Sequence, residues 1–167
     1  MTTDLRVDSE RMLASFNELA MIGATADGGV HRPALSESHL AARKWFRTEV
    51  ERSGLEFHVD GAGNHSAVLV TDSRVAPHDL GGVYRDQTLL IGSHLDSVPN
   101  GGRFDGALGV IAALEVLKTI KANGVRLRVQ LEAIDFTDEE GTLVGLLDNG
   151  EPLLGVVHFP AIGETLY

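Results

Sequence analysis

The sequence contains no cysteine, which excludes disulfides and thiolate metal sites. Any bound metal must therefore be held by histidine and carboxylate side chains. Basic residues are the minority, with 14 Lys and Arg against 24 Asp and Glu and a formal net charge of −10. This balance disfavours nucleic acid and anionic membranes as partners, because both attract a basic face. It is compatible with a site for a cation.

Long apolar runs are also missing. No stretch approaches the roughly 20 residues of a membrane span. The N-terminal sequence MTTDLRVDSE lacks a basic region followed by an apolar one, so we expect no signal peptide and a cytoplasmic location. The 167 residues, 43% of them hydrophobic, suit one compact domain with a real core.

Three segments have the apolar spacing of helices. Their expected extents are 8–23, 36–54 and 107–124. Ser36 is a plausible N-cap of the second helix, and Leu40, Trp45 and Val50 are expected on or near one face of it. The third helix is mostly apolar, and three charged residues are expected on its solvent-exposed side. They are Glu115, Lys118 and Lys121.

Alternating polarity predicts strands over 55–60 and 66–72, followed by a loop over 73–86. The apolar run that opens 87–97 is typical of a strand buried on both faces. A further strand is expected after residue 124. Strand, helix and strand around 88–136 then form a βαβ unit with parallel neighbours.

Polar residues follow both strands of this unit. They are His94, Asp96, Asp138, Glu139 and Glu140. Because open α/β sheets bind ligands at the carboxyl ends of their strands, we expect these side chains to converge there. Asp105, which precedes the helix, falls at the same end.

Histidine, aspartate and glutamate are suitable ligands for Zn²⁺, Mn²⁺, Co²⁺ or Ni²⁺. Asp105 is placed to bridge two ions, and Asp96 is placed to orient His94. Of the neighbours Glu139 and Glu140, one can bind metal while the other acts as general base.

Each residue alone also has an ordinary structural interpretation. His94 and Asp96 suit a polar pair at a strand end, Asp105 suits a helix N-cap, and the two glutamates suit a solvated turn. Their joint placement on one topology favours the metal site. A phosphate-binding loop, a dinucleotide-binding fingerprint and a nucleophile elbow are all missing.

At these residues the chain resembles the M20 family of metal-dependent peptidases and amidohydrolases. The stretches GSHLDSVPNGGRFDGALGV and DFTDEEGTLVG resemble the signatures of its hydantoinase/carbamoylase branch, and RPALSESHLAARKWF and VDGAGN fit the upstream pattern. That branch includes N-carbamoyl-L-amino-acid hydrolases and allantoate amidohydrolases. The resemblance covers roughly residues 8 to 147.

The resemblance implies an α/β fold of the three-layer zinc-peptidase type, in which helices flank a mixed sheet. It implies that His94 binds one ion, that Asp105 bridges both, and that Glu140 binds the other. Glu139 is then the general base, and Asp96 the carboxylate behind His94. The implied reaction is hydrolysis of a linear amide or ureido C–N bond through an activated water. Full-length relatives are expected to be homodimers.

The chain is shorter than the members of that family. We expect 1–147 to be the N-terminal part of a catalytic domain, 148–167 to be a divergent tail, and the lid domain to be missing. His158, in the tail, is expected at a surface position, and Arg103 to be an ordinary loop charge. No residue is assigned to the substrate. Two alternatives remain open, a non-catalytic remnant that self-associates and an M20 aminopeptidase or deacylase.

Overall fold

The computed structural model describes residues 5–69, 88–127, 129–141, 143–148, 151–159 and 164–166. The helices are α1 (Ser9–Ala20), α2 (Glu37–Arg52) and α3 (Ala107–Ala122). One sheet contains β1 (Glu56–Val59), β2 (His65–Leu69), β4 (Gln130–Phe136) and β3 (Thr88–His94), in that spatial order. A second sheet contains β5 (Leu143–Asp148), β6 (Glu151–Phe159) and β7 (Glu164–Leu166).

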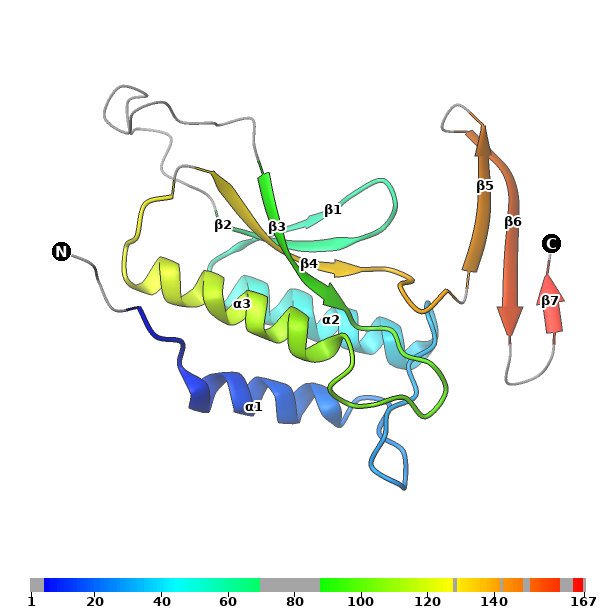
Figure 1. Cartoon of the computed structure of the whole chain (residues 1–167), viewed down its shortest axis with the longest axis horizontal. Coiled ribbons are helices and arrows are strands. Elements are labelled where there is room, and N and C mark those ends of the chain that lie inside the picture. Colours follow the sequence, from blue (N-terminus) through cyan, green and yellow to red (C-terminus); the bar gives the residue numbers. More distant parts are fainter. Residues whose placement is uncertain are drawn as a thin grey trace.

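The first sheet places the two polar segments at one edge. β3 and β4 are parallel, as predicted, and α3 connects them (Figure 1). In their register His94 is opposite Phe136, so both strands end at the same level. β2 is antiparallel to β4, and β1 is antiparallel to β2. The residues after His94 and those after Phe136 therefore leave the sheet side by side.

The three predicted helix starts are confirmed, α3 beginning at Ala107, and two of the helices have side-chain caps. Asp8 caps α1 by accepting the N–H of Arg11, and Ser36 caps α2 by accepting the N–H of His39. The three helices lie on the same side of the first sheet in Figure 1. The apolar side chains of the helices form one core with those of β2 and β4. This core includes Phe46, Leu114 and Ala133. The mixed α/β class is confirmed, and α1 packs against α3.

The burial predicted for β3 is wrong. β3 is not buried on both faces, because it is the edge strand of its sheet and leaves Leu89 and Leu90 about half exposed. Leu40 is 52% exposed, because the core-facing side of α2 carries Ala42 and Phe46 instead. Whether these apolar side chains are buried depends on how the helices and strands pack together, which the local sequence pattern does not show.

Glu115 was expected to face solvent, and this prediction is also wrong. The side chain is 2% exposed and accepts hydrogen bonds from Nε and Nη2 of Arg11, at 2.9 and 2.6 Å. It also accepts the backbone N–H of Asp8, at 3.0 Å. Lys118 is likewise largely covered and pairs with Glu49 at 3.1 Å. Glu115 therefore joins α3 to the start of α1.

Substituting Glu115 by alanine is expected to lower the free energy of unfolding by about 2 kcal/mol, because the Asp8 N–H and the Arg11 guanidinium lose their acceptor. Glu51→Ala is the matched control. Its partner Arg47 is more than half exposed, so the loss should stay below about 0.5 kcal/mol. Urea unfolding of both variants measures the difference, and equal losses would contradict the role of Glu115.

The C-terminal segment forms the second sheet, in which β6 pairs with both β5 and β7. β5 runs across the predicted boundary at residue 147, and His158 lies in β6. Residues 70–72 of the predicted second strand and the predicted loop 73–86 fall outside the described residues. Among the residues that the structure describes, no helix is long and apolar enough to cross a membrane.

Candidate metal centre

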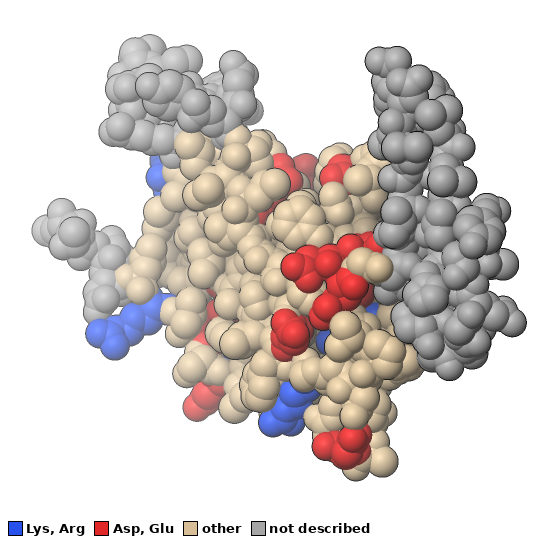
Figure 2. Space-filling view, turned by 45° about the vertical axis from the view of Figure 1, so that its right-hand side comes forward, with Lys and Arg blue, Asp and Glu red and all other residues tan. Residues whose placement is uncertain are grey.

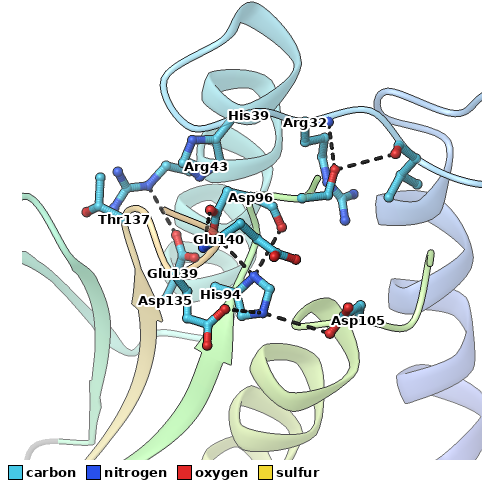
Figure 3. A network of polar contacts seen from close by, with 12 residues as sticks. Arg32, His39, Arg43, His94, Asp96, Asp105, Asp135, Thr137, Glu139 and Glu140 are labelled. Carbon is cyan, nitrogen blue, oxygen red and sulfur yellow. Dashed lines mark hydrogen bonds and ion pairs between the residues drawn. The ribbon is translucent and has the colours of Figure 1, made fainter. Parts of the chain in front are cut away.

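His94 ends β3 with its imidazole facing a group of carboxylates. The residue is 4% exposed. Its Nε2 lies 3.3 Å from Oε2 of Glu139 and 4.0 Å from Oδ1 of Asp105 (Figure 3). The carboxylates come from two segments, the one that precedes α3 and the one that follows β4. The topology thus brings together residues that are far apart in the sequence.

Asp96 lies on the opposite side of the imidazole. Its Oδ1 is 3.3 Å from Nδ1 of His94, and its Oδ2 accepts the backbone N–H of Glu140 at 3.1 Å. Hydrogen bonding to Asp96 raises the pKa of His94 to about 9, although burial acts in the other direction. A metal ion at Nε2 would therefore displace a proton below that pH. Asp96 therefore orients His94 through its carboxylate and through its backbone carbonyl, which lies 3.1 Å from Nδ1. Its carboxylate also holds the chain at Glu140.

The donor set fits a divalent cation. One ligand atom from each of His94, Glu139 and Glu140 can be chosen so that all lie within 4.8 Å of one another. Asp105 is adjacent but outside this group, and its side chain is 65% exposed. Burial raises the pKa of Glu140, and the negative charges of Asp105, Asp96 and Glu139 add to this effect. A cation would relieve that crowding of like charges.

Negative charge also collects on this side of the molecule. The side at which β3 and β4 end comes forward in Figure 2, and acidic side chains gather there in one patch.

Arg103 is not directed to a carboxylate in the contacts described. Its guanidinium carbon lies 5.0 Å from the ring centre of Phe104 and 5.9 Å from that of Phe16.

Gly106 brings the loop with Asp105 against the imidazole. Its φ is 62°, and a Cβ there would lie 2.5 Å from both Cε1 and Nδ1 of His94. Gly106 is also the N-cap of α3, where no side chain makes a capping hydrogen bond. The interpretation of Asp105 as the N-cap is therefore wrong, and its carboxylate is left to face His94.

A buried polar layer lies behind Asp96, and the sequence alone predicts no role for it. Arg43 donates from Nε to Oδ2 of Asp135 at 3.1 Å, and both side chains are almost fully buried. Arg32 is fully buried and donates from Nη1 to the carbonyl of Leu19. His39 accepts the N–H of Leu35, and burial followed by the charge of Arg43 lowers its pKa to about 4. The stretch RPALSESHLAARKWF contains Arg32, His39 and Arg43, and its basic residues within a partly apolar segment are the available signal.

Comparison with known proteins finds several relatives of one kind. The chain is 37% identical to an N-carbamoyl-L-amino acid amidohydrolase of Geobacillus stearothermophilus over 81% of its own length and 31% of the relative's. It is also 37% identical to an allantoate amidohydrolase of Bacillus subtilis, over 74% of this chain and 28% of the relative. A solved hydantoinase/carbamoylase family amidase from Burkholderia ambifaria matches with a TM-score of 0.73 and 37% identity, over 84% of this chain and 32% of that one. The chain is related to the hydantoinase/carbamoylase amidohydrolases.

This relationship confirms the resemblance found in the sequence. The model of Peptidase family M28 also matches, over residues 77–147, a range that includes His94, Asp105 and both glutamates. The chain spans about a third of the length of these hydantoinase/carbamoylase relatives.

Proposed function

We propose that this chain carries the metal site of a hydrolase that cleaves linear amide or ureido C–N bonds. The substrates would be small molecules of the N-carbamoyl amino acid or allantoate type, as the names of its relatives suggest. The observation that carries the proposal is the surroundings of His94, with Asp96 on Nδ1 and acidic groups around Nε2. Such carboxylate–histidine pairs are typical of metal centres.

In this proposal His94, Asp105 and Glu140 would hold the divalent metal. Zinc, manganese, cobalt or nickel would suit the nitrogen and oxygen donors. Bound ions of this kind polarise a substrate carbonyl and make water a better nucleophile. No described residue is assigned to holding the substrate.

The chain's own residues would contribute orientation and proton transfer. Asp96 fixes the imidazole of His94 so that Nε2 faces the acidic group. Glu139, whose side chain is 55% exposed, would take a proton from the attacking water and later deliver it to the leaving nitrogen. Asp96 also fixes the Glu140 N–H, which keeps both glutamates close to His94.

We further propose that residues 1–147 represent one part of a catalytic domain, and that a complete enzyme needs additional chain. The whole relatives are about three times as long as the region matched. Because catalysis depends on geometry to within ~1 Å, we expect the 167-residue chain alone to hydrolyse such substrates very poorly. A remnant without metal and an aminopeptidase or deacylase are the competing functions.

The decisive experiment is calorimetric titration of Mn²⁺ or Zn²⁺ into the wild type and the His94→Ala variant. The wild type should bind, and the variant should lose at least about 100-fold in affinity, because a ligand matters at least as much as the groups that orient it. His58→Ala, at an exposed position of β1, is the matched control and should bind like the wild type.

A wild-type chain without affinity for either metal would support the non-catalytic remnant. Equal affinities of the wild type and His94→Ala would remove His94 from the site. Release of ammonia from an N-carbamoyl amino acid, compared with release of an amino acid from a dipeptide, would separate the amidohydrolase from the aminopeptidase.

A further inference from the structure

The segment that carries both glutamates has left the sheet, and hydrogen bonds hold it at both ends. β4 ends at Phe136, so the following residues lie beyond its ladder. At one end the N–H of Thr137 donates to Oδ1 of Asn64 at 3.0 Å, and its hydroxyl lies 3.3 Å from the same atom. At the other end the N–H of Glu140 donates to Asp96. Glu139 lies between these two attachments.

Asn64 is itself held in one orientation by Asp60. Oδ2 of Asp60 accepts from Nδ2 of Asn64 at 2.9 Å, which directs the remaining amide oxygen to Thr137. Oδ1 of Asp60 accepts the backbone N–H groups of Ala62 and Asn64, both at 2.9 Å. The turn between β1 and β2 is therefore closed by its own side chains, as in other aspartate-initiated turns.

The same turn is fastened to the buried layer behind the site. Arg43 of α2 donates to the carbonyl of Gly63 and, through Nε, to Asp135 near the end of β4. β2 begins at His65, which is opposite Asp135 in the sheet register. Asn64 is thus joined to α2, β2 and β4, and its position is fixed independently of the glutamates.

We propose that the turn of residues 60–64 is a positioning element for Glu139 and Glu140, and that Asn64 is its positioning residue. The inference rests on the proposed metal-binding function. Asn64 does not contact the metal position. Its amide oxygen accepts the Thr137 N–H at the point where the chain leaves β4. This hydrogen bond limits the movement of the segment that carries the two carboxylates. Sites whose supporting groups are removed become too loose to bind or act well.

The test compares metal affinity and ligand geometry in four proteins: wild type, Asn64→Ala, Asn64→Asp and the double variant Asp60→Asn/Asn64→Asp. Asn64→Asp places two carboxylates face to face and breaks the Asp60–Asn64 bond. The double variant exchanges donor and acceptor, so it restores every contact and the net charge. Asn123→Ala, which removes a side-chain bond at the far end of α3, is the control for a general loss of stability.

We expect Asn64→Ala and Asn64→Asp to bind Zn²⁺ about 10-fold more weakly, in the range known for groups that orient ligands. The visible absorption of bound Co²⁺ should also change. The double variant should recover the wild-type affinity and spectrum, and Asn123→Ala should retain both. If Asn64→Ala does not fold, the comparison of Asn64→Asp with the double variant still decides.

Unchanged affinity and spectrum in Asn64→Asp would overturn the inference while leaving the metal site intact. So would a double variant that folds but fails to recover, or a loss in Asn123→Ala as large as that in Asn64→Asp. A wild-type chain that binds no metal would instead overturn the proposed function, and the inference with it.

Discussion

Gly106→Ala is expected to reduce metal affinity by at least about 100-fold while leaving the fold in place. The added Cβ would meet the imidazole of His94 at 2.5 Å, as well as the backbone carbonyl of the same residue. Because backbone cannot yield easily, the imidazole or the loop with Asp105 must move. The φ of 62° at this position adds strain for any side chain.

Gly102→Ala is the matched control for that substitution. It lies in the same loop, and the nearest atom to its added Cβ is the Cβ of Asp105 at 3.9 Å, an ordinary contact. Calorimetric titration with Zn²⁺ should therefore separate the two alanine variants. If Gly106→Ala binds like Gly102→Ala, the close approach of loop and imidazole is not needed for the site.

The second large effect is expected from separating the roles of the two glutamates. Glu140→Gln should weaken metal binding by about 10- to 100-fold. Glu139→Gln should leave affinity within about 3-fold, yet lower any hydrolysis by about 10²- to 10⁴-fold, because the general base is lost. The substitution is isosteric in both cases, so the measured difference reflects charge.

Titration of the two variants with Mn²⁺, together with ammonia release from an N-carbamoyl amino acid, measures the separation. Glu139 is also close enough to share a metal ion with His94, because its Oε2 lies 3.3 Å from Nε2 of His94. If Glu139→Gln loses the metal and Glu140→Gln keeps it, the two roles are reversed.

The sequence was sufficient for the features that depend on local pattern. Ser36 caps α2 as predicted because an N-cap needs only its neighbours. The parallel pairing of β3 and β4 follows from the intervening helix, and it places His94 and the glutamates at one edge. The approximate location of the candidate centre could therefore be predicted without coordinates.

Features that depend on distant partners could not be predicted in this way. Glu115 is buried because Arg11, on another helix, lies against it. β3 is exposed because of its position in the sheet order, which no single strand encodes. The hydrogen bond from Thr137 to Asn64 joins residues 73 positions apart, and only the fold brings them together. Such long-range contacts support the site, whereas its chemistry is visible in short motifs.

Divalent-metal binding by His94 and the surrounding carboxylates is tested most directly by anomalous diffraction at the zinc edge, from crystals of the chain grown with Zn²⁺. We expect an anomalous peak within bonding distance of Nε2 of His94, with Asp105 and Glu140 among the ligands and Asp96 still against Nδ1. Zinc bound elsewhere on the chain, with no peak at Nε2 of His94, would contradict it.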